Sequence, residues 1–343
     1  RQDIRKKREK KEIGIPIENI NKKELKRRGH EIGDILGCDE KGEEICVRKG
    51  KGNLYVDGNM EKEQLFDFMR SQIYQNIQRG DSMVIVDLGS RIYKRELWIY
   101  LTIHGYRVDS YNMDCMTESD CFNCLDGLGA ENEEQIVMIA NDIIDDQKYK
   151  FMTYPVETVC KALLSAVLLA SLTEMEESDR NMLEIATIFR LGVSGTMLDK
   201  ILHVMFEELD ETSSAKQLFA MYSEAEEGIR MEAIQKIGNA LAVYEKRANG
   251  SLCDNFRTNR YDMEMPVKEK SVLFIESGQL PEDKVLFSVF MERLYDSMLK
   301  KAEERQQDVT VMLLDYPYYG GLCGLEKYME EGPEKGICTT LYE

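Results

Sequence analysis

Histidine and long hydrophobic runs are scarce in this chain of 343 residues. The three histidines, His30, His104 and His203, lie in different segments, so no pairing of a nucleophile with a base is visible. We interpret His203 as a helix-packing residue. The most apolar stretch, residues 158–172, contains Lys161 and is shorter than the ~20 residues that a transmembrane helix needs. It therefore predicts a buried core helix.

A second pair of closely spaced cysteines is also missing. The nine cysteines are odd in number and form no regular framework, and we expect no signal peptide, which together favour a reduced, cytosolic protein. Cys121 and Cys124 have the spacing of zinc ligands, but His104 is the only histidine near them in the sequence. Zinc as a rule takes four ligands. We therefore expect ordinary buried or loop thiols and no metal site.

Positive charge is lacking outside the first 30 residues. Residues 1–30 contain twelve basic and five acidic side chains, and the rest of the chain contains 33 basic and 58 acidic ones. Because attraction to phosphate needs a positive face, the bulk charge does not support DNA binding. The basic cluster at residues 5–11 is typical of a solvated tail, and also of a segment just cytoplasmic of a membrane helix. We expect a cytoplasmic protein, or the cytoplasmic part of a membrane-anchored one.

Strand and helix patterns alternate at both ends of the chain. Strands are predicted at residues 44–47, 53–56, 82–87, 106–111, 271–275, 309–315 and 337–342, and helices flank them at 61–78, 91–104 and 282–304. Strand, helix and strand at this spacing form βαβ units of a parallel sheet. Helical periodicity dominates between residues 131 and 245. The sequence thus predicts an α/β fold, a mostly parallel sheet with an inserted all-α domain.

Two of the apolar strands run into an aspartate, at Asp87 and at Asp315. In an open α/β sheet, ligands gather at the carboxyl ends of the strands. An apolar strand followed by aspartate is the Walker B arrangement, in which the carboxylate holds Mg²⁺ directly or through water. Aspartate also ends many strands that bind nothing, so each signal is weak by itself.

The phosphate-binding pattern G-x-x-x-x-G-K-[ST] does not occur in the chain. The slot that it would occupy is residues 57–65, between a predicted strand and a predicted helix, where Gly58 is the only glycine. Lys62 is a candidate phosphate ligand only if the register slips by one residue. Glu61 and Glu63 near a helix N-terminus stabilise the helix dipole but repel a triphosphate.

The serial order of these features resembles the cytoplasmic part of the type IV secretion coupling proteins, the TraG-type conjugal DNA-transfer ATPases. Short family motifs are matched, in order, by residues 84–93, 105–108, 123–125, 313–317, 324–327 and 335–338. The resemblance covers roughly residues 30–343. It implies a RecA-like, P-loop-NTPase-type fold that is interrupted by an all-α domain.

This resemblance divides the chain into four parts. They are a basic juxtamembrane-like segment (1–30), the first part of the RecA-like domain (31–130), the inserted all-α domain (131–262) and the second part of the RecA-like domain (263–343).

The departures from the family pattern concentrate at the nucleotide site. Where the family has Gly-Lys-[Ser/Thr], this chain has Lys62, Glu63 and Gln64, so the phosphate-binding lysine becomes Glu63 and the Mg²⁺-binding hydroxyl becomes Gln64. The acid that polarises the attacking water becomes Tyr316, and the lysine of the loop after Asp87 becomes Gly89. These losses together predict a site without catalytic residues.

Some residues of a nucleotide site nevertheless remain. Asp315 is the retained Walker B-type carboxylate, and Gly58, Lys62 and Asp87 are the other candidate nucleotide-binding residues. We expect no cofactor, and ATP with Mg²⁺ only if the degenerate site is rescued.

The resemblance implies a degenerate coupling-protein homologue of a conjugative or type IV secretion apparatus, acting as a non-catalytic subunit, a substrate receptor or a scaffold. One alternative is a DNA-translocating ATPase subunit that is active only in a mixed ring. Another is an unrelated α/β protein-binding module. The expected partners are proteins of the secretion or conjugation machinery, including the relaxosome or a catalytic homologue, in a homo- or hetero-oligomer. The inserted domain, whose acidic surface suits a basic protein, is the expected partner-binding element, and a merely solvated acidic face is the alternative.

Overall fold

The computed structural model describes residues 35–38, 44–46, 52–56, 62–88, 92–145, 153–190, 195–248, 256–277, 283–314 and 324–342. Its centre is a six-stranded sheet with the order β3-β8-β7-β4-β6-β5, in which all neighbouring strands are parallel. These strands are β3 (Leu54–Val56), β4 (Ser82–Leu88), β5 (Arg107–Asn112), β6 (Ser271–Ser277), β7 (Val309–Leu313) and β8 (Ile337–Tyr342). A separate antiparallel pair consists of β1 (Ile35–Cys38) and β2 (Glu44–Cys46).

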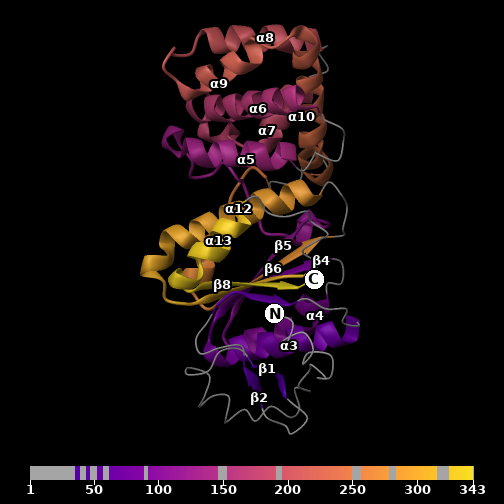
Figure 1. Ribbon diagram of the computed structural model, residues 1–343, viewed down its shortest axis with the longest axis vertical. Helices are drawn as coiled ribbons and strands as arrows, with labels where there is room; N and C mark the ends of the chain where they lie inside the picture. Colours follow the sequence, from indigo (N-terminus) through magenta and orange to yellow (C-terminus); the bar gives the residue numbers. More distant parts are fainter. Residues whose placement is uncertain are drawn as a thin grey trace, which may run out of the picture.

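Helices cover both faces of the sheet, as Figure 1 shows. Alternate strand residues such as Met83 and Ile85 pack with α3 (Lys62–Arg79) and α4 (Ile92–Ile103) on one face. The residues between them, such as Val84, belong to a larger core on the opposite face, together with α12 (Asp283–Lys301) and α13 (Leu325–Glu331). Burial on both faces explains why these strands are continuous apolar runs in the sequence.

A block of helices follows β5 and precedes β6 in the sequence. It consists of α5 (Glu133–Asp145), α6 (Tyr154–Glu174), α7 (Met182–Arg190), α8 (Gly195–Glu207), α9 (Ser214–Ser223) and α10 (Glu227–Ala248). Because β5 and β6 are neighbours in the sheet, the block is an insertion within the α/β unit. The shorter helices are α11 (Met265–Lys268) and the 3₁₀ turns η2 (Met116–Glu118), η3 (Ala130–Asn132), η5 (Glu177–Asp179), η6 (Ala302–Glu304) and η8 (Pro333–Lys335).

Helix α6 is the central helix of the block and contacts α5, α9 and α10. Among the described helices it alone has the length and composition to cross a membrane, but 78% of its most apolar window is buried inside the protein. Its one lysine, Lys161, lies 2.7 Å from Asp145 and 2.8 Å from Glu157. The predicted core helix is therefore confirmed.

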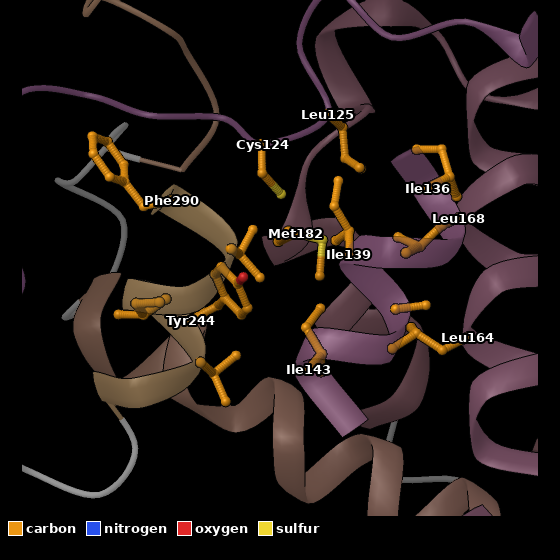
Figure 2. Close-up of a cluster of buried hydrophobic side chains, with 14 of the residues drawn as sticks. Cys124, Leu125, Ile136, Ile139, Ile143, Leu164, Leu168, Met182, Tyr244 and Phe290 are labelled. Atoms are coloured by element: carbon orange, nitrogen blue, oxygen red, sulfur yellow. The ribbon is translucent and has the colours of Figure 1, made fainter. Parts of the chain in front are cut away.

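The core of the helical block continues into the α/β part. Figure 2 shows Ile139 of α5 and Leu168 of α6 in one cluster with Tyr244 of α10 and Phe290 of α12. Helix α12 packs against the sheet on one side and against α5 and α10 on the other. The inserted block and the sheet thus share one continuous apolar core.

The predicted fold class, a mostly parallel α/β sheet with an inserted all-α block, is confirmed. The four domain boundaries stay predictions, and the basic segment 1–30 lies outside the described residues. Two predicted strand ends were wrong. Strand β4 continues to Leu88, so Asp87 lies within the strand, and β7 ends at Leu313, two residues before Asp315. An apolar run marks a buried strand but does not fix the last residue of its hydrogen-bonded ladder.

Candidate functional site at the carboxyl ends of the strands

The carboxyl ends of the six strands lie at one edge of the sheet, because every neighbouring pair is parallel. This is the edge at which open α/β sheets bind ligands. Along it, the ends of β3, β8, β7 and β4 follow one another. The sequence predicted the phosphate cradle after β3 and the two carboxylates at the ends of β7 and β4.

Strand β3 is followed by α3, the strand-to-helix order in which phosphate loops occur. Helix α3 begins at Lys62, so Lys62, Glu63 and Gln64 make up the start of its first turn. The unpaired N–H groups of a helix N-terminus favour an anion. An acidic residue in the same turn opposes that anion, because the two negative charges repel. Gly58 lies outside the described residues.

Three more of the predicted site residues, Gly89, Asp315 and Tyr316, also lie outside the described residues. Asp87 is placed: its side chain is 1% exposed, on the sheet face that packs with α3 and α4. Its partner in register on β6 is Glu276, which is 2% exposed. The structure thus brings Asp87 next to a second buried acid that the sequence reasoning missed.

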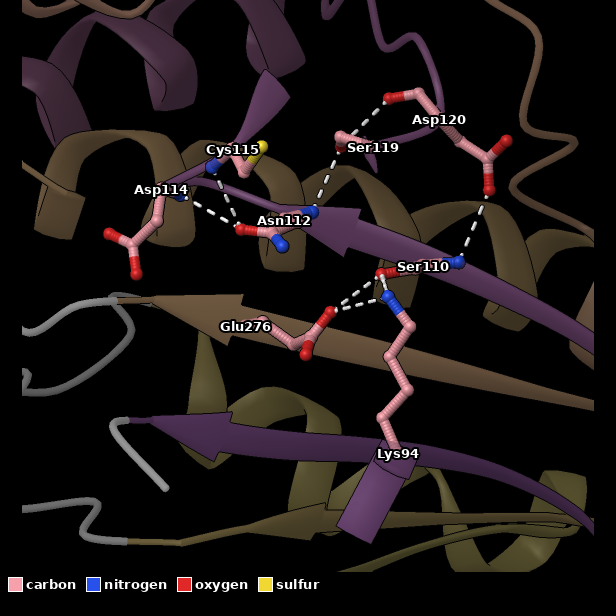
Figure 3. A network of polar contacts seen from close by, with 8 residues as sticks. All are labelled: Lys94, Ser110, Asn112, Asp114, Cys115, Ser119, Asp120 and Glu276. Atoms are coloured by element: carbon pink, nitrogen blue, oxygen red, sulfur yellow. Dashed lines mark hydrogen bonds and ion pairs between the residues drawn. The ribbon is translucent and has the colours of Figure 1, made fainter. Parts of the chain in front are cut away.

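Glu276 is neutralised by a lysine from a different element. Lys94 of α4 donates from Nζ to Glu276 Oε2 at 2.8 Å and to Ser110 Oγ at 2.9 Å, and Ser110 Oγ donates to Glu276 Oε2 at 2.8 Å (Figure 3). A buried carboxylate is stable when it is paired and hydrogen-bonded in this way. Glu276 therefore ties α4 and β5 to β6.

A signal for Glu276 was present in the sequence. It follows the apolar run 271–275 just as Asp87 follows 82–86. The same pattern thus occurs at three strands of the sheet, and only the fold shows that at β6 the acid is held by an ion pair.

A second polar network at this edge joins the helical block to the sheet. Asp283, at the start of α12, is fully buried and accepts a hydrogen bond from Ser277 Oγ of β6 at 2.9 Å. Arg247 of α10 pairs with the same carboxylate and lies 3.7 Å from Asp114, after β5. Burial raises the pKa of Asp283, although Arg247 and Ser277 act to lower it. One arginine thus connects the last turn of α10 to the ends of β5 and β6.

A metal site is not assembled in the described part of the chain, where no group of three or more histidines, cysteines or acids is placed to hold an ion. Cys121 and Cys124 are buried free cysteines. Burial raises the pKa of Cys124 to about 12. Its thiol is therefore protonated at neutral pH, whereas a metal needs the thiolate. His104 is exposed, and its Nδ1 lies 2.8 Å from the carbonyl oxygen of Tyr100.

The sheet order, the strand-to-helix junction and the helical insertion define the class: a RecA-like, P-loop-NTPase-type fold with an added helical domain. No protein-family model matches the chain, and no curated protein matches it by sequence. Solved structures do match it. The unbound bacterial conjugative coupling protein TrwBdeltaN70 matches with a TM-score of 0.61 at 15% identity, over 94% of this chain and 69% of that chain.

Two nucleotide complexes of the plasmid coupling protein TrwB are similar to a comparable degree. The complex with the non-hydrolysable ATP analogue ADPNP has a TM-score of 0.59 at 14% identity, covering 94% of this chain and 70% of that chain. The complex with ADP and Mg²⁺ has a TM-score of 0.59 at 14% identity, covering 93% of this chain and 69% of that chain. At these identities the likeness establishes the fold. The coupling-protein fold that the sequence resemblance predicted is confirmed.

Proposed function

We propose that this chain is a coupling-protein homologue of a conjugative or type IV secretion apparatus, and that it acts as a non-catalytic subunit, substrate receptor or scaffold. One observation carries the proposal. The chain has the fold of TrwB over 94% of its length, yet the first turn of the helix after β3 begins Lys62-Glu63-Gln64. The matched proteins are described as coupling proteins of bacterial conjugation, which supports a role in the same kind of apparatus.

Charge at the start of α3 supports the non-catalytic part of the proposal. A lysine in a phosphate cradle attracts the triphosphate, whereas a glutamate in its place repels it. Two unit charges about 4 Å apart near a protein surface interact by about 4 kcal/mol. Exchanging attraction for repulsion of that size weakens binding by several orders of magnitude, since each ~1.4 kcal/mol is a factor of ten. The tyrosine at position 316 also cannot polarise an attacking water as a carboxylate does.

The inserted helical block is the receptor element in this proposal, and its partners are proteins of the secretion or conjugation machinery. The fold matched to TrwB includes this block, so the block is part of what this chain shares with coupling proteins. We further propose a cytoplasmic location, as the cytoplasmic part of a membrane-anchored protein. The basic cluster at residues 5–11 supports this, because such clusters sit beside the inner membrane surface.

Isothermal titration of the whole chain with ATP and Mg²⁺ tests the proposal. We expect no saturable heat and no phosphate release. Micromolar binding with turnover would overturn the non-catalytic role. Substitution of the retained carboxylate, Asp315→Ala, separates this role from the mixed-ring alternative. We expect the variant to support normal transfer in a strain that depends on this chain, and loss of transfer would favour a subunit that completes a catalytic site.

A further inference from the structure

Helices α6, α7 and α8 form an apolar groove in the helical block. Its lining includes Val167 of α6, Met175 just after α6, Ile188 of α7, and Leu202, Met205 and Leu209 from α8 and the turn after it. Met205 is 45% exposed although it lies in this concave apolar surface. Apolar side chains exposed in a groove are typical of a binding surface, and methionine adapts to differently shaped partners.

Exposed acidic side chains line the groove or follow its lining residues closely in the sequence, and we call them its acidic rim. Glu174 lines it at the end of α6, and Glu177, Glu207 and Glu208 are exposed near the ends of α6 and α8. Residues 174–227 contain thirteen acidic and only four basic side chains. Two of the four basic side chains already pair with acids: Arg190 with Glu245 and Lys216 with Glu211.

This charge decides which kind of partner fits. A strongly negative rim repels nucleic acid and anionic lipid, and it attracts a basic protein segment. An apolar pocket between helices suits an apolar anchor side chain on one face of an amphipathic helix.

We propose that the α6–α7–α8 groove binds a basic amphipathic helix of a partner protein. The apolar face of that helix lies against Met205 and its neighbours, and its lysines and arginines reach the carboxylates of the rim. The apolar contact supplies affinity, and the rim supplies selection for positive charge. This inference rests on the proposed function, because it gives the receptor block a site and a class of partner.

A labelled model peptide of leucine and lysine tests the groove by fluorescence anisotropy with the whole chain. The peptide has about 14 residues, roughly four helical turns, with leucines at positions i, i+3, i+4 and i+7. Two control peptides are used. One has the same composition in a scrambled order, and the other has glutamate in place of lysine. We expect saturable binding of the first peptide, binding at least tenfold weaker for the scrambled one, and none for the acidic one.

Two aspartate variants on the same helical turn provide the matched test. Met205→Asp places a charge in the groove, whereas Val204→Asp places the same charge on a neighbouring side chain that is 59% exposed and does not line the groove. We expect Met205→Asp to weaken peptide binding at least tenfold, because the burial of one methionine is lost. Val204→Asp should change binding less than twofold.

A second pair of variants avoids the risk that Met205→Asp fails to fold. Glu174→Lys reverses an exposed charge in the groove lining, and Glu226→Lys reverses an exposed charge outside it. We expect at least fivefold weaker binding for the first variant and less than twofold for the second. Equal losses within either pair, or equal binding of the ordered and scrambled peptides, would overturn the proposal in favour of a merely solvated acidic face.

Sedimentation velocity without peptide tests whether a second copy of this chain occupies the groove instead. Self-association that Met205→Asp abolishes would also overturn the proposal. The outcome is independent of the nucleotide titration: ATP turnover would refute the non-catalytic role without changing peptide binding, and absent peptide binding would refute the groove alone.

Discussion

Asp199 makes a three-way contact that should hold the outer helices of the block together. It lies on α8, is 7% exposed, and accepts hydrogen bonds from Tyr222 Oη of α9 at 2.6 Å and from Arg230 Nε of α10 at 3.0 Å. Burial tends to raise the pKa of Asp199, but the hydrogen bonds from Arg230 and Tyr222 outweigh it, and the pKa lies below its usual value. The carboxylate is therefore ionised and accepts hydrogen bonds from both donors at once.

The substitution Asp199→Asn removes the charge and keeps the shape. A hydrogen bond to a charged group contributes about 1.5–3 kcal/mol, and a hydrogen bond between neutral groups contributes about 1 kcal/mol. Asparagine retains one acceptor oxygen but turns an NH₂ donor toward the donors of Arg230 or Tyr222. The side chain of Arg230 is 18% exposed, so water recovers part of the loss. We expect the free energy of unfolding of the block to fall by about 2–3 kcal/mol.

Urea unfolding followed by far-ultraviolet circular dichroism measures this loss. Glu207→Gln, which removes an exposed charge from the same helix, is the control and should change stability by less than about 0.5 kcal/mol. The effect also has a defined pH dependence. Because the folded pKa of Asp199 is lowered, its contribution is present above the unfolded pKa and is lost as the pH falls through the folded pKa. Asp199→Asn should therefore approach the parent protein in acid. A loss below about 1 kcal/mol at neutral pH, or one unchanged in acid, would refute the reasoning.

Three further predictions concern the α/β part. Lys94→Met leaves the buried charge of Glu276 unpaired and should lower the free energy of unfolding by about 3 kcal/mol, and adding Glu276→Gln should restore more than half of this loss. Urea unfolding followed by the fluorescence of Trp98, the one tryptophan of the chain, measures both variants. Burial raises the pKa of Glu292, so its stabilising contribution is present below its usual pKa of 4.5 and is lost as the pH rises through the folded value. In a series of unfolding measurements across pH, Glu292→Gln should therefore reduce this fall in the free energy of unfolding. Burial also raises the pKa of Cys124 to about 12, so iodoacetamide should modify it, by mass spectrometry, only after denaturation.

Most of the secondary structure could be predicted from the sequence, because the patterns that indicate helices and strands are local. The apolar run 271–275 predicted β6, and the helical periodicity between residues 131 and 245 predicted the block that contains α9. The order of the strands in the sheet could not be predicted. Strand β6 lies between β4 and β5, although the whole helical block separates it from both in the sequence. Such pairings depend on packing between distant segments, which periodicity does not report.

The candidate site was less predictable from the sequence than the fold, for a related reason. Asp87, Glu276 and Asp315 follow the same kind of apolar run, so one pattern offered three candidate carboxylates. Glu276 was passed over, and it is the acid whose role the structure defines, through Lys94 from another helix. A pattern along one strand identifies an acid at the edge of a sheet, but its neutralising partner comes from elsewhere in the fold.

The connection between the helical block and the sheet bears on whether the two parts move relative to each other. The two parts share one apolar core through α12, and Arg247 clamps α10 to the buried Asp283 beside the end of β6. A ligand shifts a conformational equilibrium only by its difference in affinity for the two states. If no nucleotide binds at α3, ATP cannot bias such an equilibrium from that edge of the sheet. The block then serves best as a fixed platform for the groove, and hydrogen exchange in α10 that changed on adding ATP and Mg²⁺ would contradict this view.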